Sequence, residues 1–233
     1  MTPLNVWNRK ALPDYAINLA NAQGANIPYP AFGILDGKAK SLLHRDTEWI
    51  YFDHSYFKRG WDKGNFRCVR NGLHLTRILD RPDDRLRRFE VEIEPWRKTG
   101  REIVIIPPSE AQIAIYGNSD WLVNVETRLS EITDRPVTSK TSKHTPLRDY
   151  LSDAWCVVTF ASVAGIEAAL MGVPVFSTSN CPSWPVSAGR LEDIETPQYA
   201  ENRSEWASSL CYASWNWEEM KNIKWHDYYY EHL

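Results

Sequence analysis

Apolar and polar residues follow strand-like and helix-like patterns in turn along the second half of the chain. The short apolar runs that predict buried strands lie at 102–106, 136–139, 156–160 and 173–176. The segments with helix caps or helical apolar spacing lie between them, at 119–133, 145–152 and 163–171. Strands that alternate with helices predict an α/β fold with a parallel sheet and right-handed crossovers.

The first half has fewer regular patterns. An apolar run at 49–52 predicts a buried strand that delivers Asp53 and His54 at its end. Residues 66–77 alternate around Asn71-Gly72, a pair that favours the positive φ angles of a type I′ turn. These residues therefore predict a β-hairpin.

The composition limits the classes of protein to which this chain can belong. With 233 residues, 43% of them hydrophobic, the chain can form one large domain or two small ones. No segment has the apolar length of a membrane span and the N-terminus lacks a signal-peptide pattern, so a cytoplasmic protein is expected. The four cysteines form no CxxC pair and have no histidine at zinc-ligand spacing, which favours reduced structural thiols.

Charge is unevenly distributed along the chain. The net charge of −3 excludes a uniformly basic nucleic-acid binder, yet residues 58–101 hold thirteen basic and seven acidic residues, a local net of +6. This asymmetry indicates an anionic partner for the first half, with a solvated, mixed-charge linker as the alternative. The candidate contacts to DNA or another polyanionic acceptor are Lys58, Arg59, Arg67 and Arg70.

The segment 156–176 is a compact strand–turn–helix–strand unit. Its helix begins at the carboxyl end of a parallel strand, where open α/β sheets bind ligands and backbone N–H groups favour phosphate. Ser162 lies at that turn and either contacts a phosphate oxygen or caps the helix. Glu167 lies beside the apolar line of the helix and is expected to border its buried face, where it would bind ribose hydroxyls or pair with a nearby cation.

Two further loops leave the same edge of the predicted sheet. Lys140 and Lys143 are candidate pyrophosphate ligands, with Arg135 as another, although loop lysines are often only solvated. Ser109 could contact the phosphate or sugar of a donor, or cap the next helical turn.

Asp53 and His54 are candidate general bases, with Asp53 slightly favoured. This role requires the first half to face the second across a cleft. The alternative is an ion pair with Lys58 or Arg59.

The run HTPLRDYLSDAWCVVTFASVAGIEAALMGVPVF at 144–176 resembles the donor half of GT-B glycosyltransferases. It looks closest to the capsule-polysaccharide and Kdo-transferase-like branch and to related bacteriophage proteins, through Ser162, Glu167-Ala168 and the Gly-x-Pro-Val segment at 172–175. The stretches IVIIPPSE, TDRP and WIYFDHSYF also look like the phage members. The resemblance implies two Rossmann-like domains around a central cleft, a nucleotide-sugar such as a UDP-sugar as co-substrate, and no essential metal.

The resemblance gives the domains expected here: an acceptor-side α/β domain at 1–99, a donor-binding domain at 100–205 and an aromatic helical tail at 206–233 that crosses between them. The first is small for an acceptor domain, and the acidic motif usual in larger sugar transferases is absent. No predicted strand ends in Asp-x-Asp, which argues against a metal-dependent transferase.

The expected function is transfer of a sugar to a hydroxyl group. In a phage context the acceptor would be a hydroxymethylated pyrimidine such as 5-hydroxymethylcytosine in DNA, flipped from the stack to reach the site, and the location would be the host cytoplasm. Three alternatives stay open: a capsular or lipopolysaccharide acceptor, a non-catalytic nucleotide-binding module, and a sugar-nucleotide epimerase of the same fold.

Overall fold

The computed structural model describes residues 29–32, 49–59, 65–142, 144–216 and 219 of the chain. The chain divides into two compact units. The first unit comprises Met1–Leu75 and Leu210–Leu233, and the second unit comprises Thr76–Ser209. Each unit contains one four-stranded sheet.

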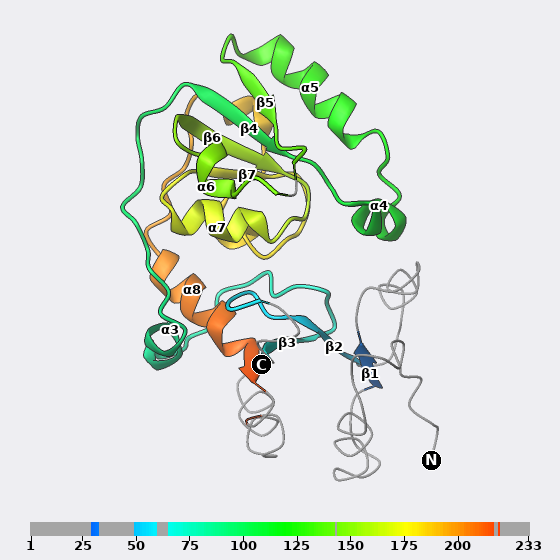
Figure 1. Ribbon diagram of the computed structural model, residues 1–233, viewed down its shortest axis with the longest axis vertical. Helices are drawn as coiled ribbons and strands as arrows, with labels where there is room; N and C mark the ends of the chain where they lie inside the picture. The colour runs from blue at the N-terminus through cyan, green and yellow to red at the C-terminus, as the bar shows by residue number, and fades with distance from the viewer. Residues whose placement is uncertain (1–28, 33–48, 60–64, 143, 217–218, 220–233) are drawn as a thin grey trace. The chain divides into compact units, whose positions relative to one another are not determined.

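The second unit is built on a parallel sheet with the strand order β5-β4-β6-β7 (Figure 1). Its strands are β4 (Glu102–Ile106), β5 (Val137–Ser139), β6 (Ala154–Thr159) and β7 (Val175–Ser177). Its α-helices before α8 are α3 (Asp84–Arg88), α4 (Glu110–Tyr116), α5 (Trp121–Ile132), α6 (Leu147–Tyr150) and α7 (Ala164–Leu170). Two short 3₁₀ turns follow β7, at Trp184–Val186 and Leu191–Asp193. The predicted alternation of parallel strands and helices is confirmed and is Rossmann-like.

Apolar side chains cover both faces of this sheet. On one face, alternate residues of β4, including Ile103 and Ile105, join a core with Val125 and Leu129 of α5. On the other face Val104, the residue between them, is fully buried as well. Burial on both faces is what a parallel sheet requires, because its crossover helices lie against both sides.

The direction of the chain across the sheet reverses between β4 and β6. From β4 the chain crosses to β5 on one side; it then returns past β4 to β6 and continues outward to β7. The loops that follow β4 and β6 therefore leave the carboxyl edge in opposite directions. In open α/β sheets the crevice between two such loops is the usual ligand site.

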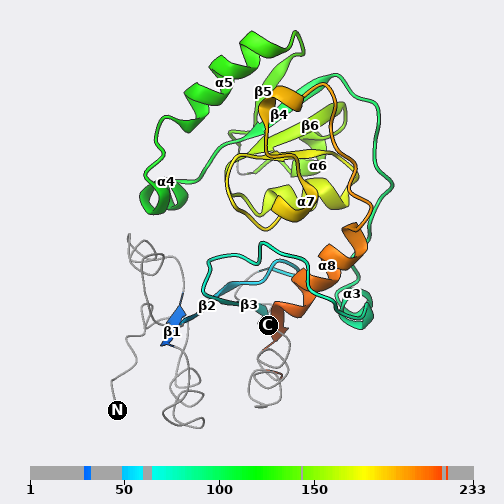
Figure 2. The same ribbon diagram turned by 180° about the vertical axis from the view of Figure 1, so that it is seen from behind.

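The sheet of the first unit is mixed, with the order β1-β2-β3-β8. Its strands are β1 (Tyr29–Phe32), β2 (Trp49–His54), β3 (Asn65–Arg70) and β8 (Ser214–Asn216). β1 is parallel to β2, whereas the β2–β3 and β3–β8 pairs are antiparallel. The helix α8 (Arg203–Tyr212) carries the chain into β8, as can be followed in Figure 2.

The predicted hairpin at 66–77 is wrong beyond its turn. Asn71 does adopt a positive φ of 52°, but β3 pairs with β2 and β8 and not with the residues after the turn. Leu73 and Leu75 are buried instead, and Arg67 Nε donates to the Leu73 carbonyl oxygen at 3.1 Å. A strand from far along the chain thus occupies the edge that a hairpin would have used.

The C-terminal tail also differs from the prediction in the residues that are described. α8 ends at Tyr212 and a strand follows it, so the tail is not one continuous helix. Ser214–Asn216 pairs in register with Arg67, Phe66 and Asn65 of β3. The residues from 220 onward lie outside the described part of the chain.

The 94–97 segment binds the carboxyl end of α7. Glu94 N donates to Leu170 O at 2.8 Å, and Arg97 N donates to Gly172 O at 2.7 Å. These bonds satisfy carbonyl groups that a helix end leaves unpaired. They also explain why residues 76–99, which were expected in the acceptor-side half, group with the second unit.

The structure bears on the cysteines and on the expected lack of a membrane span. The four cysteines, Cys68, Cys156, Cys181 and Cys211, are free and buried. Across the ranges that the structure describes, none of the helices combines the length and apolarity needed to cross a membrane.

Candidate functional site

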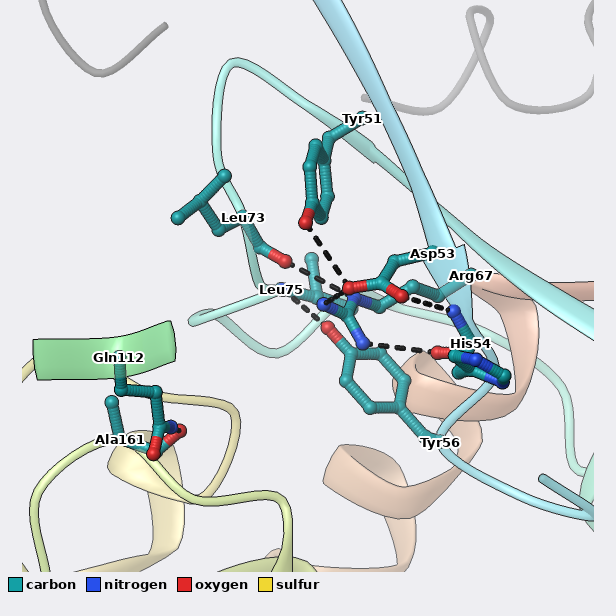
Figure 3. A network of polar contacts seen from close by, with 9 residues as sticks. All are labelled: Tyr51, Asp53, His54, Tyr56, Arg67, Leu73, Leu75, Gln112 and Ala161. Atoms are coloured by element: carbon teal, nitrogen blue, oxygen red, sulfur yellow. Dashed lines mark hydrogen bonds and ion pairs between the residues drawn. The ribbon is translucent and has the colours of Figure 1, made fainter. Parts of the chain in front are cut away.

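A glutamine side chain joins the two loops at the point of strand reversal. Ser109 begins α4 with a capping box, in which its Oγ accepts from Gln112 N and Gln112 Oε1 accepts from Ser109 N at 2.9 Å. The same side chain donates from Nε2 to the Ala161 carbonyl oxygen at 2.6 Å (Figure 3). The loop after β4 and the loop after β6 are therefore held together by Gln112. We call these two loops the switch-point loops.

Ser162 lies in the second switch-point loop, two residues before the first residue of α7. It is half-buried, and its Oγ accepts from Ala164 N at 3.1 Å, so it serves the start of the helix. That bond uses one lone pair and leaves the hydroxyl proton available for a phosphate oxygen. The prediction that Ser162 is the N-cap of this helix is wrong, because the N-cap is Val163 and has no side-chain cap, while the phosphate role stays a prediction.

Lys140 follows β5 at the same carboxyl edge. Its backbone N donates to Ile105 O at 2.8 Å, which continues the pairing of β5 with β4. Its ammonium donates to Ser142 O at 2.5 Å and lies 5.3 Å from the centre of the Tyr150 ring. The edge therefore holds a positioned cation, and Lys143, the other predicted ligand of this loop, lies outside the described residues.

The expectation that Glu167 borders the buried face of its helix is wrong, because its side chain is exposed. The buried residues of α7 are Gly165, Ile166, Ala168 and Ala169. These residues place the buried face on the side of the helix opposite Glu167, while Val163 and Leu170 of the predicted apolar line are only half-buried at its margin. A ribose could reach Glu167 only from the solvent side.

Arg135 lies at the opposite edge of the sheet from Ser162 and Lys140, so it does not join them. It precedes β5 and donates to Glu195 at 2.8 Å and to Gly100 O at 3.0 Å, and its guanidinium stacks 3.9 Å from the centre of the Trp155 ring. A strand of five residues separates the two edges by about 16 Å. The prediction that Arg135 shares a phosphate site with Lys140 is therefore corrected.

The amino edge of the sheet contains a hollow of about 600 Å³, which we call the amino-edge hollow. Its lining includes Arg101, Glu102, Thr133, Arg135 and Glu195. Burial acts to raise the pKa of Glu195, but hydrogen bonds from Thr133 and Arg135 outweigh it and lower that pKa. Within the lining, the charges of Arg135 and Glu195 are thus paired with each other.

In the first unit, Asp53 is paired with Arg67 (Figure 3). The distance from Arg67 Nη2 to Asp53 Oδ2 is 2.7 Å, and the two side chains are 3% and 10% exposed. The Tyr51 hydroxyl donates to the same carboxylate oxygen at 3.1 Å. The predicted alternative, an ion pair of Asp53, is therefore present, but its partner is Arg67 in place of Lys58 or Arg59.

The four cations proposed to bind an acceptor do not form one surface. Arg67 is buried within the first unit, whereas Lys58 and Arg59 are exposed. Arg67 and Arg70 stand three residues apart on β3, so their side chains leave opposite faces of the sheet. The prediction that Arg67 binds the acceptor is therefore wrong, because its guanidinium is enclosed.

His54 follows Asp53 and is half-buried. Burial lowers the pKa of its imidazole; the Asp53 charge acts to raise it, and the charges of Arg59 and Arg67 lower it further. The imidazole is therefore neutral at pH 7, which is the state that can accept a proton.

His74 gives a prediction for the dependence of stability on pH. Its Nδ1 is buried without a hydrogen-bond partner within the described structure, and burial and the charges of Arg67 and Arg59 hold its pKa well below 6.5. Below pH 6.5 the unfolded chain binds a proton that the folded chain does not, so stability falls as pH falls, by up to about 1.4 kcal/mol per pH unit for this group. Urea unfolding at pH 7.5 and pH 5.5 should show this loss.

The control for this prediction is His74→Phe, which keeps an aromatic ring near Tyr56 and removes the titrating group. Its free energy of unfolding should depend less steeply on pH than that of the parent. Equal slopes in the two proteins would contradict the assignment to His74.

The comparisons with known proteins identify no family for this chain. A search of protein-family models and a search of curated proteins both find no match to this chain. Within the described ranges, no group of three or more His, Cys, Asp or Glu residues could hold a metal ion.

Proposed function

We propose that this chain is a glycosyltransferase that binds a nucleotide-sugar donor, best represented by a UDP-sugar, between the switch-point loops. One observation carries the proposal: the strand order reverses between β4 and β6, and Gln112 ties together the loops that follow those strands. Open parallel sheets bind nucleotides in the crevice at such a reversal.

Each predicted donor ligand at this edge has a role in the proposal. Ser162 and Lys140 bind the diphosphate, together with Lys143, and Ser109 lies beside the donor sugar or phosphate. Glu167 accepts hydrogen bonds from the ribose hydroxyls. The lysine charge stabilises the nucleoside diphosphate as it leaves, when negative charge grows on its bridging oxygen.

In this proposal the residues of the first unit recognise the acceptor. The acceptor hydroxyl is assigned first to a hydroxymethylated pyrimidine of DNA, with Lys58 and Arg59 as exposed phosphate contacts. Because Arg67 is enclosed, the cations available to a polyanion are fewer than the sequence suggested. This observation favours a glycan hydroxyl as the second candidate acceptor.

Incubation with radiolabelled UDP-sugars tests the proposal. Three reactions are compared: with DNA containing 5-hydroxymethylcytosine, with lipopolysaccharide or capsular oligosaccharide, and without acceptor. We expect label to move to one of the two acceptors. UDP affinity should fall roughly tenfold or more in Glu167→Ala, since hydrogen bonds to a charged group are lost. Donor binding or hydrolysis without transfer would instead support a non-catalytic nucleotide-binding module.

A further inference from the structure

The amino-edge hollow is lined by three separate segments of the second unit. They are the start of β4, the turn that joins α5 to β5, and the segment that follows the second 3₁₀ turn. Its volume of about 600 Å³ falls in the range of sites that hold small molecules. The hollow lies at the other end of the strands from the switch-point loops.

Two arginines line the hollow, and each is anchored through its Nε atom. Arg101 Nε donates to Asp153 Oδ2 at 2.6 Å, and Arg135 Nε donates to Glu195 Oε2 at 2.8 Å. The Trp155 ring also holds Arg135, with its centre 3.9 Å from the guanidinium carbon. Among the residues that the structure describes, neither Nη2 group has a hydrogen-bond partner. Two positioned guanidinium groups can therefore donate to an anionic group in the hollow.

Two carboxylates of the same lining have no cationic partner. Glu102 and Asp134 form no ion pair within the described part of the chain. The Glu102 carboxylate accepts only a long hydrogen bond there, from the Thr138 hydroxyl at 3.4 Å. The pairing of β4 with β6 also shifts register between Glu102 and Ile103, an irregularity of the kind that redirects side chains beside binding sites. The hollow therefore presents negative charge next to the two guanidinium groups.

The rest of the lining is partly apolar. Ile132, the last residue of α5, is half-buried, and Pro136, directly before β5, is exposed. Apolar surface with a few convergent polar groups is typical of small-molecule sites. A ligand that matches this lining has one anionic group, one cationic group and a small apolar part.

We propose that the amino-edge hollow binds a free α-amino acid with an aliphatic side chain. Arg101 and Arg135 bind its carboxylate, and Glu102 and Asp134 bind its ammonium group. The aliphatic side chain lies on the apolar part of the lining. This inference does not rest on the proposed function, because the switch-point loops are at the opposite edge of the sheet.

Titration of the ¹⁵N-labelled full chain with L-leucine, followed by amide chemical shifts, tests the proposal. Two analogues serve as matched ligands: 4-methylpentanoate lacks the ammonium group, and 3-methylbutylamine lacks the carboxylate. We expect saturable shifts at 101–102, 133–135 and 195, with a Kd for leucine below about 1 mM. Each analogue should bind roughly tenfold more weakly or worse, because it loses the charge-assisted hydrogen bonds of one end.

Two substitutions separate the two ends of the ligand. Arg101→Gln should weaken the binding of leucine and 4-methylpentanoate roughly tenfold and leave that of 3-methylbutylamine unchanged. Arg101 is 82% exposed, so the fold should tolerate this change. Glu102→Gln keeps an acceptor for the Thr138 hydroxyl and should weaken leucine and 3-methylbutylamine instead. Arg128→Gln is the control, since it removes a charge from an ion pair outside the lining and should bind leucine like the parent.

The outcomes distinguish a site for amino acids from simpler alternatives. If 4-methylpentanoate binds as tightly as leucine, the hollow is an anion site, and if 3-methylbutylamine does, it is a cation site; either result overturns the proposal. Leucine shifts that do not saturate, or that lie only outside the lining, also overturn it. A loss in Arg128→Gln as large as that in Arg101→Gln would do the same. None of these results bears on the binding of UDP at the switch-point loops.

Discussion

The Gly172→Ala variant is expected to lose roughly 2–5 kcal/mol of its free energy of unfolding, since two independent costs add. Gly172 has a φ of +74°, a conformation that costs a residue with a side chain about 1–2 kcal/mol. A Cβ at this position would also lie 2.1 Å from the Pro95 carbonyl oxygen. The obstructing atom is backbone of the 94–97 segment, so relieving the contact requires that segment to move away from α7.

The matched control is Gly117→Ala. Gly117 ends α4 with a similar φ of +69°, but a Cβ there would meet nothing within 4 Å. The conformational cost alone predicts a loss of about 1–2 kcal/mol. Urea unfolding of both variants measures the difference. Equal losses in the two variants would show that the close approach of the 94–97 segment contributes nothing.

The Arg203→Ala variant is expected to lose roughly 2–4 kcal/mol, since it removes two charge-assisted hydrogen bonds in a buried place. Arg203 Nη1 donates to Ala169 O at 2.7 Å and Nη2 donates to Glu94 O at 2.8 Å. Its guanidinium carbon also lies 3.8 Å from the centre of the Trp96 ring. Arg203 therefore joins α7 to the 94–97 segment through side-chain contacts, as the backbone bonds of Glu94 do through the main chain.

Arg148→Ala provides the control, because Arg148 contacts the same glutamate from the surface. Its Nη2 lies 3.0 Å from Glu94 Oε1, and its side chain is 69% exposed. Exposed ion pairs contribute less than about 1 kcal/mol, so thermal and urea unfolding should show little change. A loss in Arg148→Ala as large as that in Arg203→Ala would contradict the account of the buried contact.

The elements that sequence predicted well are those fixed by local pattern. The apolar run at 102–106 coincides with β4, and the helix expected at 119–133 contains α5. Strand order depends on contacts between distant residues, so the reversal between β4 and β6 was visible only in the structure. β8 illustrates the same limit: it has only three residues, and its pairing with β3 gives a strand to a segment without a strand pattern.

The candidate site was predictable to a similar extent. Ser109 and Gln112 have the S-x-x-Q spacing of a capping box, a local signal that would have identified Gln112. Its bond to Ala161 spans 49 positions and has no local signature. Arg135 was assigned to the wrong edge because it precedes its strand, and residues that precede a parallel strand lie at the amino edge.

The ion pair in the first unit was beyond sequence analysis for a comparable reason. Asp53 and Arg67 meet through the antiparallel register of β2 and β3, in which these two residues are direct partners. Without the register, Lys58 and Arg59 are the nearest cations along the chain. Arg67 is therefore not a surface residue. Its guanidinium is buried and donates to the His54 carbonyl oxygen.

The central claim is that a nucleoside diphosphate binds between the switch-point loops. Titration of the ¹⁵N-labelled protein with UDP, followed by amide chemical shifts, tests it most directly. We predict saturable shifts at the amides of 109–112 and 161–166, on the carboxyl edge of β4 and β6. Shifts confined to the amino-edge hollow, at Arg101, Arg135 and Glu195, or no saturable shifts at all, would contradict it.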